Sequence, residues 1–267
     1  QNVMIGSESG KHFYEADANG NGGRNVGIGY KAYYNGDSGT VANNTGFDNV
    51  AIGTRAMGNL AASGSSYALS GDYNTAIGNY ALSSLNTGGN NTAIGYEAAD
   101  NITTGGNNVA IGYEALTTED TGSGTVAIGY RSLLNQNYDG TSGNIAIGNS
   151  AGQEVTTALY STFIGASSGG ASAANPLTGN NNMCIGYGAG YDIEGGCSGS
   201  LFVGNYAGYS TTTGGLGNTA IGYQALYTSQ VSLRNTAIGY QALYTHNFGS
   251  TDYGNNIAIG YVSLKAL

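Results

Sequence analysis

The chain has 267 residues, including 48 glycines, 22 tyrosines and one proline, and its formal net charge is −9. Collagen requires glycine at every third position and much proline, and a disordered chain has more charge and fewer aromatic residues than this one. The seven Lys and Arg residues are scattered, so nucleic acid is excluded as a partner, because neutralising phosphates requires clustered cations. No run of 18 apolar residues is present, so no segment of the sequence is expected to span a membrane.

A short string built around Ile-Gly, or once Val-Gly, recurs fourteen times along the chain. Its consensus is N-[VTI]-A-I-G-Y-x-A-L, and the best copies cover residues 218–226 and 235–243. The repeat glycines are Gly6, Gly29, Gly53, Gly78, Gly95, Gly112, Gly129, Gly148, Gly165, Gly186, Gly204, Gly222, Gly239 and Gly260. Most spacings are 17 to 19 residues, and the first three are 23, 24 and 25. A period of this size predicts a solenoid.

Each repeat contains a segment suited to a short strand that ends at its glycine. The third residue before the glycine is mostly Val, Thr or Ile, which favour extended backbone. Glycine recurs too often for helices, and no apolar stripe of helical period lasts ten residues. The sequence therefore predicts an all-β fold, a parallel β-solenoid of about fourteen coils with a base period of 17. We expect one domain over residues 1–267, with longer inserted loops at 7–75 and regular coils at 76–267.

Five columns of the aligned repeats are named here by their place relative to the repeat glycine. They are the Ile column (the residue before it), the Ala column (second before), the β-branched column (third before), the Asn column (fourth before) and the Leu column (fourth after). Asn occupies its column in eleven copies, which predicts side-chain hydrogen bonds from coil to coil.

The uniform Ile column favours a buried ladder of stacked side chains inside the coils. Its members include Ile52, Ile77, Ile94, Ile111, Ile128, Ile147, Ile221, Ile238 and Ile259. Neighbouring residues of a strand face opposite sides, so the Ala column is then expected to form a flat outer face through which chains associate. On this interpretation Ile111→Ala costs roughly 2 to 5 kcal/mol of stability.

The side chains that carry catalysis or bind metals form no recognisable pattern in the sequence. His12 and His246 stand near opposite ends, and no His/Cys/Asp/Glu cluster has metal-ligand spacing. We therefore predict no enzyme activity, no catalytic residue, no metal and no cofactor. Glu97 and Glu114 share a column in adjacent repeats, which favours a solvated or intersubunit charge ladder over a catalytic cleft pair.

Two points stay open at the level of sequence. Cys184 and Cys197 either pair in an oxidising setting or remain separate thiols. The tyrosines that follow eight of the repeat glycines form either an exposed row that binds sugars or a ladder packed between coils or subunits.

The long insertions near the N-terminus are candidate recognition loops. They mix polar and aromatic residues, as adaptable binding loops do, and a solenoid would bring them together on one side. The candidate binding residues are Phe13, Tyr14, Tyr33, Tyr34, Asp37 and Tyr67. Neutral accumulation of insertions in solenoid turns is the alternative.

The repeated Asn-x-Ala-Ile-Gly string resembles the head repeat of YadA-type trimeric autotransporter adhesins. Residues 49–53 (Asn-Val-Ala-Ile-Gly) and 108–112 match that motif well, and similar repeats occur in viral and bacterial tail-fibre proteins. The resemblance implies a left-handed β-roll and a homotrimer that contacts a cell-surface, matrix or glycan receptor.

We therefore expect an extracellular fibre or adhesin head segment at a cell or virion surface, with a role in attachment and virulence. A subunit of a self-assembling extracellular filament is the main alternative. A polysaccharide-degrading tailspike ranks below it.

Overall fold

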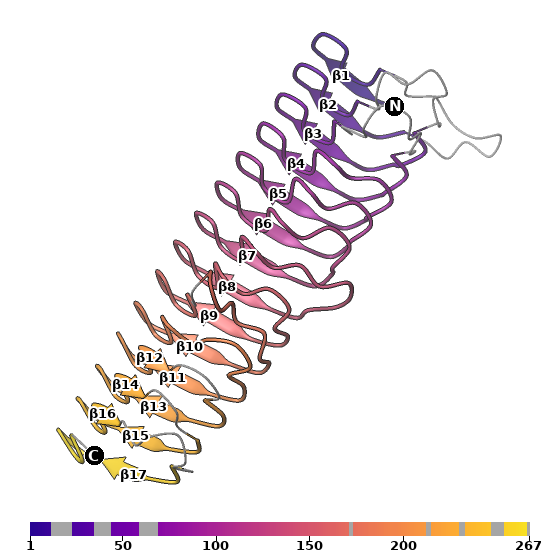
Figure 1. Ribbon diagram of the computed structural model, residues 1–267. Helices are drawn as coiled ribbons and strands as arrows, with labels where there is room; N and C mark the ends of the chain where they lie inside the picture. Colours follow the sequence, from indigo (N-terminus) through magenta and orange to yellow (C-terminus); the bar gives the residue numbers. More distant parts are fainter. Residues whose placement is uncertain are drawn as a thin grey trace. The chain divides into compact units, whose positions relative to one another are not determined.

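The computed structural model describes residues 1–11, 23–34, 44–58, 69–170, 173–211, 215–229, 233–246 and 254–265. The fold is all-β, with no helix in these ranges, and short parallel strands stack as a β-solenoid. Figure 1 shows one main strand for each coil. No helix among the described residues is long and apolar enough to cross a membrane. The fold class predicted from the repeat is confirmed.

Each main strand has three residues and ends at the residue before a repeat glycine. The strands are β1 (Val3–Ile5), β2 (Val26–Ile28), β3 (Val50–Ile52), β4 (Thr75–Ile77), β5 (Thr92–Ile94), β6 (Val109–Ile111), β7 (Val126–Ile128), β8 (Ile145–Ile147), β9 (Thr162–Ile164), β10 (Met183–Ile185), β11 (Leu201–Val203), β13 (Thr219–Ile221), β15 (Thr236–Ile238) and β17 (Ile257–Ile259). Between Gly78 and Gly239, nine successive turns cover 161 residues, so the mean period is about 18 rather than 17. The expected count of about fourteen coils also includes end turns that lie partly outside the described residues.

The chain divides into two compact units. Unit 1 comprises residues 1–127 and 137–141, and unit 2 comprises residues 128–136 and 142–267. In unit 1, strands β1 to β6 pair in chain order, and every pair is parallel with the repeats in register. In unit 2, β8, β9, β10, β11, β13, β15 and β17 pair in the same way.

Unit 2 also contains a second, three-stranded parallel sheet (Figure 1). It consists of β12 (Ser210–Thr211), β14 (Thr228–Ser229) and β16 (Thr245–His246), which pair coil to coil. These three coils therefore have strands on two sides. Among the described residues, this second sheet is confined to the three coils that carry these strands.

The two faces of the main strands are opposite to the sequence prediction. The Ala column is fully buried, as at Ala76, Ala110 and Ala220, whereas the Ile column is only half-buried or exposed. Ile147 and Ile259 expose 39% and 64% of their surface. The Ala column therefore fills the coil interior, and the Ile and β-branched columns point outward. The cost predicted for Ile111→Ala as a core residue is accordingly wrong for a single chain, because its side chain does not lie in the core.

The narrow interior explains why alanine rather than isoleucine points inward. The two columns line the same interior. Leu82, Leu116 and Leu226 of the Leu column are fully buried, and Gly208 of that column lies against the Phe202 ring of the Ala column. In several coils a large side chain in one column is matched by a small residue in the other. Phe163 and Phe202 occupy the Ala column where Gly169 and Gly208 occupy the Leu column. In the opposite sense, Gly27 stands in the Ala column and Tyr33 in the Leu column.

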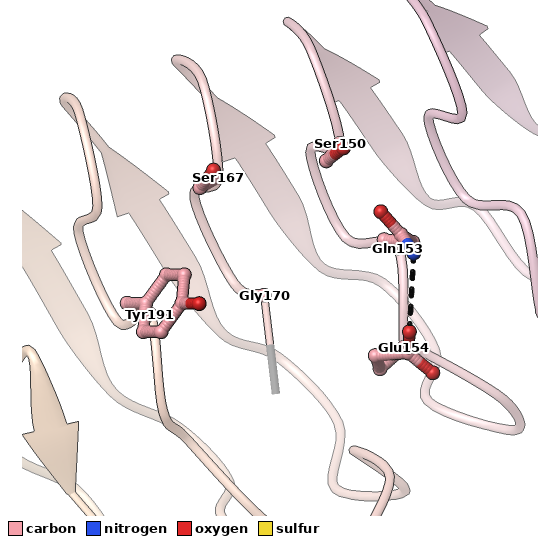
Figure 2. A pocket seen from close by; sticks show the side chains of 6 residues that line it. All are labelled: Ser150, Gln153, Glu154, Ser167, Gly170 and Tyr191. Carbon is pink, nitrogen blue, oxygen red and sulfur yellow. Dashed lines mark hydrogen bonds between the residues drawn. The ribbon is translucent and has the colours of Figure 1, made fainter. Parts of the chain in front are cut away.

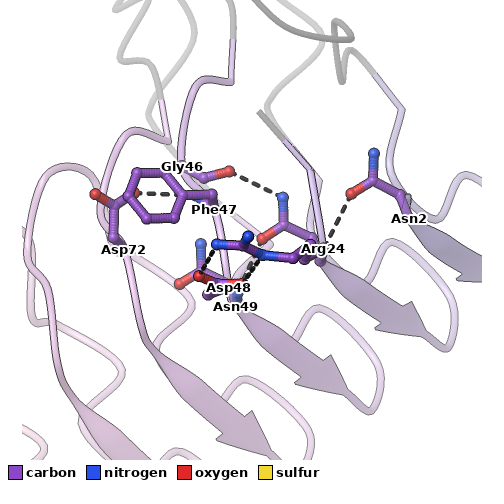
Figure 3. Close-up of polar contacts among 8 residues, drawn as sticks. Asn2, Arg24, Gly46, Phe47, Asp48, Asn49 and Asp72 are labelled. Atoms are coloured by element: carbon purple, nitrogen blue, oxygen red, sulfur yellow. Dashed lines mark hydrogen bonds and ion pairs between the residues drawn. The ribbon is translucent and has the colours of Figure 1, made fainter. Parts of the chain in front are cut away.

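The Asn column forms the predicted ladder of hydrogen bonds. The backbone N–H of Asn74 donates to Asn49 Oδ1 at 2.8 Å, and Asn91 N–H donates in turn to Asn74 Oδ1 at 2.9 Å. The side-chain Nδ2 atoms donate to carbonyl oxygens of the coil, for example from Asn91 to Gly105 at 2.9 Å. Figure 3 shows the N-terminal part of this ladder, next to the ion pair between Arg24 and Asp48. These buried amides are satisfied, which is the condition for burying polar groups without loss of stability.

Residues with positive φ shape the corner that follows each strand. The repeat glycines have φ between 122° and 141°, a region that other residues rarely adopt. The second and fourth residues after the glycine are left-handed even where they are not glycine, as at Glu114 (φ 51°) and Leu116 (φ 55°). The Glu114 N–H donates to the Tyr96 carbonyl of the preceding coil at 2.9 Å. Hydrogen bonding between coils therefore continues through the corner.

Candidate interaction surfaces

The first candidate surface is the outward sheet face, defined as the β-branched and Ile columns of the main strands. No charged residue occurs at any of its positions, and threonine is the only polar type present. Its members are half-buried by their neighbours in the ladder or exposed. The large exposed ones are Val3 (49%), Ile5 (56%), Ile145 (38%), Ile147 (39%), Met183 (42%), Ile257 (68%) and Ile259 (64%). Within each unit this face is a regular apolar surface with no covering segment among the described residues.

The second candidate surface consists of tyrosines. The first tyrosine row follows the repeat glycine, and its eight members are all exposed, by 40 to 80%. Its members are Tyr30, Tyr96, Tyr113, Tyr130, Tyr187, Tyr223, Tyr240 and Tyr261. The rings of Tyr223 and Tyr240 stack with centroids 5.3 Å apart, and those of Tyr240 and Tyr261 with centroids 5.2 Å apart. The row is therefore exposed in the single chain while its rings stack from coil to coil, and sugar binding and packing between subunits stand as the alternatives.

A second tyrosine row runs through unit 2 at the fifth residue after the glycine. Tyr191, Tyr209, Tyr227 and Tyr244 stack with centroid separations of 4.9 to 5.0 Å and interplanar angles of 2° to 6°. Burial raises the pKa of Tyr209 and Tyr227 above the usual value, so their hydroxyls are protonated at neutral pH. Sequence reasoning missed this row. Counting five residues on from the repeat glycines would have revealed it.

Tyr206 joins the two rows into one surface. Its ring meets Tyr223 edge to face at 6.4 Å and Tyr227 at 6.3 Å, so it contacts a member of each row. Gln224 and Gln241 occupy the same column as Tyr206 in the next two coils, and Gln241 Nε2 donates to Gln224 Oε1 at 2.8 Å. The name tyrosine field is used below for Tyr206 with the rows Tyr223–Tyr240–Tyr261 and Tyr191–Tyr209–Tyr227–Tyr244.

Stacking decides which part of these rings is available to a ligand. The expectation for a sugar-binding row was that flat ring faces would offer the contact. In rows whose ring planes are nearly parallel and whose centroids are 4.9 to 5.0 Å apart, neighbouring rings stack face on face. A tyrosine with a neighbour on each side therefore exposes its ring edge and its hydroxyl group. Only a ring at the end of a row, such as Tyr261, exposes a face.

The recognition loops predicted near the N-terminus are not confirmed. Tyr33 is fully buried and Tyr34 is 3% exposed, so neither presents a ring to a partner of this chain. The Tyr33 hydroxyl donates to the Gly46 carbonyl at 3.1 Å, and burial raises its pKa. Tyr33 fills the space left by Gly27, which is why it lies inside. The other four candidates, Phe13, Tyr14, Asp37 and Tyr67, lie outside the described residues.

The described residues contain no group of three or more His, Cys, Asp or Glu side chains placed to hold a metal. A shallow depression of about 220 Å³ is lined by Ser150, Gln153, Glu154, Ser167, Gly170 and Tyr191 (Figure 2). Gln153 Nε2 donates to Glu154 Oε1 at 3.2 Å. These lining side chains include no histidine, lysine or cysteine that could activate a serine hydroxyl.

The cysteines do not bridge coils. Cys184 is a fully buried free thiol in the Ala column, and burial raises its pKa. The Cys197 thiol lies 3.5 Å from the Thr211 carbonyl oxygen, to which it donates. Both side chains therefore pack as small apolar groups, and the alternative of a disulfide between them is not realised in this structure.

Glu97, Glu114 and Asp100 form a small acidic patch in unit 1. Burial, then the charge of Glu97, raises the pKa of Asp100 to about 7. A carboxyl group whose pKa is raised by folding stabilises the fold in its protonated form. The contribution of Asp100 to folding stability is therefore lost as the pH rises through about 7.

We expect Asp100→Asn to stabilise unit 1 at pH 8 by roughly 1 to 2 kcal/mol, after allowing for the partial exposure of this side chain. At pH 4 the native Asp100 is already protonated in the fold, so the gain should nearly vanish. Thermal unfolding at the two pH values measures the difference. An equal gain in stability at pH 4 and at pH 8 would show that the Asp100 carboxyl is ionised in the fold at both pH values.

Comparison of the chain with protein-family models, with curated proteins and with solved structures finds no match.

Proposed function

We propose that this chain is a segment of an extracellular fibre or adhesin head that assembles as a homotrimer and attaches to a cell, matrix or host surface. The observation that supports the proposal is the outward sheet face. A soluble chain rarely leaves a regular, uncharged, apolar face open to water, and such faces are typical of association sites. Closed cyclic symmetry buries the same face on every copy at once. Three copies are favoured by the resemblance of the repeats to trimeric adhesin heads and tail fibres.

The rest of the chain suits a role in extension and attachment. Each coil contacts only its neighbours, so added coils lengthen a solenoid without enlarging its core. The first tyrosine row is exposed and the second is half-buried except at the exposed Tyr191. Tyrosine is enriched where proteins recognise partners. No observation among the described residues favours the tailspike alternative, which needs a carboxylate-lined groove.

The outward sheet face can be tested by placing charge on it. We expect the unmodified chain to sediment at three times its chain mass at micromolar concentration. The variant Ile94→Glu/Ile111→Glu should shift it to the monomer, because a buried unpaired carboxylate is strongly unfavourable in an interface. Sedimentation equilibrium measures the mass, and circular dichroism checks that the fold persists.

Thr104→Glu is the matched control, since Thr104 is exposed in the turn that leads to β6 and lies off the sheet face. This variant should remain trimeric. A monomeric unmodified chain, or a double variant that assembles as well as the control, would disprove the proposed assembly.

A further inference from the structure

We infer that the tyrosine field of unit 2 binds a neutral, extended, β-linked glycan that lies along the stacking direction of the coils. This inference names the receptor class for the attachment proposed above and rests on that proposal. It concerns a surface distinct from the outward sheet face, so the two can be tested apart.

The distance between successive rings along each tyrosine row favours a β-linked glycan. Successive stacked rings in both rows are 4.9 to 5.3 Å apart, because the tyrosines of a row come from successive coils. A pyranose unit in an extended β-linked chain advances by about the same distance, so each coil lies opposite one sugar. Successive sugars of a β-1,4-linked chain are turned over, so the same sugar groups recur at every second coil. A polypeptide strand advances only about 3.3 Å per residue, and its polar groups fall out of step with the rows.

The chemical groups that the field presents also favour a glycan. Stacking covers the ring faces, so each row offers hydroxyl groups that both donate and accept hydrogen bonds. The column of Tyr206 contributes the amides of Gln224 and Gln241, which are half-buried and hydrogen-bonded to each other. Each amide has more donor and acceptor positions than this single bond uses. A polymer of hydroxyl groups with regular spacing is the complementary ligand.

The charged side chains around the tyrosine field limit the class of ligand. Among the described residues, Lys265 makes a cation–π contact with the Tyr244 ring of the field, at 5.9 Å. Asp192 lies at its border, where Ser210 Oγ donates to its carboxylate at 3.4 Å. Recognition of sulfated or phosphorylated polymers relies on clustered Arg and Lys side chains. The field has no such cluster among the described residues, which favours an uncharged ligand.

The test uses the full chain and the hexasaccharides of β-1,4-linked glucose and N-acetylglucosamine as probes, titrated by calorimetry. The variant Tyr227→Phe/Tyr244→Phe keeps both rings in the stack and removes two hydroxyls. We expect saturable binding by the unmodified chain, and a loss of affinity of about tenfold or more in this variant. Gln224→Leu/Gln241→Leu should weaken binding similarly.

Tyr96→Phe/Tyr113→Phe is the matched control, because Asp100 and Thr117 replace the second row in those coils of unit 1. It should bind as the unmodified chain does. Three results would overturn the inference: no binding of either hexasaccharide, equal binding by all variants, or a changed sedimentation mass in the Tyr227→Phe/Tyr244→Phe variant, which would assign the rows to a subunit contact. Trimers without glycan binding refute this inference alone, whereas glycan binding by a monomer refutes the proposed assembly alone.

Discussion

Replacing Gly222 with alanine is expected to destabilise unit 2 by roughly 4 kcal/mol or more, and to prevent folding of the coils around it if stability is marginal. Two causes combine at this position. The backbone has φ of 127°, which strains any residue with a Cβ atom, and that Cβ would lie 2.5 Å from the Gly239 carbonyl oxygen of the next coil. Backbone cannot yield there without breaking the hydrogen bonds between coils.

Two other glycines separate the causes. Gly260 has φ of 122° with no described atom within 4 Å of its added Cβ, so Gly260→Ala should cost only the backbone strain, about 1 to 3 kcal/mol. Gly196 has neither a positive φ nor a close neighbour, and Gly196→Ala should be nearly neutral. Denaturant unfolding monitored by tyrosine fluorescence ranks the three. An order other than Gly222, Gly260, Gly196 would mean that the repeat glycines are not required by stacking.

Phe202 and Gly208 share the interior of one coil, where a large residue is matched by a small one. We therefore expect a large coupling energy between changes at these two positions in the free energy of unfolding. Phe202→Ala is expected to cost about 3 to 5 kcal/mol by leaving a cavity in the core. Gly208→Leu should also be severely destabilising, because its Cβ would lie 2.5 Å from a Phe202 ring carbon. The double variant restores the pair found at Ala220 and Leu226 one coil later, where the leucine has φ of 51° against 60° at Gly208.

We therefore expect the double variant to recover at least half of the stability that the two single changes lose in sum. A double-mutant cycle in denaturant gives the coupling directly. The matched control combines Gly208→Leu with Phe163→Ala. Because these two residues lie two coils apart and do not pack against each other as a pair, this double variant should recover little stability. Additive losses in the Phe202–Gly208 cycle would show that the two columns do not share one space.

The sequence was sufficient to locate the strands but not to orient them. Alternation along Thr219–Ala220–Ile221 shows that the outer two residues share a face, and either face satisfies that pattern. Choosing isoleucine as the core assumed a wide interior, whereas a coil of about 18 residues encloses a narrow one. The exchange of Phe202 with Gly208 and of Gly27 with Tyr33 was visible in the sequence, and it identifies the inward columns because only packed partners need to compensate in volume.

The candidate surfaces were predicted less well than the fold. Loop composition pointed to Tyr33 and Tyr34, but composition cannot reveal that a tyrosine replaces a leucine of the core. The row formed by Tyr209, Tyr227 and Tyr244 was overlooked because it lies beyond the most regular part of the repeat. Exposure of the first row depended on which way the corner turns, and that is set by left-handed residues such as Glu114, whose side chain gives no hint of its φ.

The asparagine ladder has a genetic consequence. Where the column holds Asn, as in eleven copies, its side-chain oxygen accepts from the backbone of the following coil, so two such coils in succession present and require the same acceptor. Duplication or loss of one repeat between such coils, about 17 codons in the gene, then leaves both new neighbours with matching partners. Chain length can change there in whole-coil steps of about 4.8 Å while the junction keeps its hydrogen bonds. Selection can therefore adjust how far such a protein reaches by unequal recombination, without having to repair a mismatched seam.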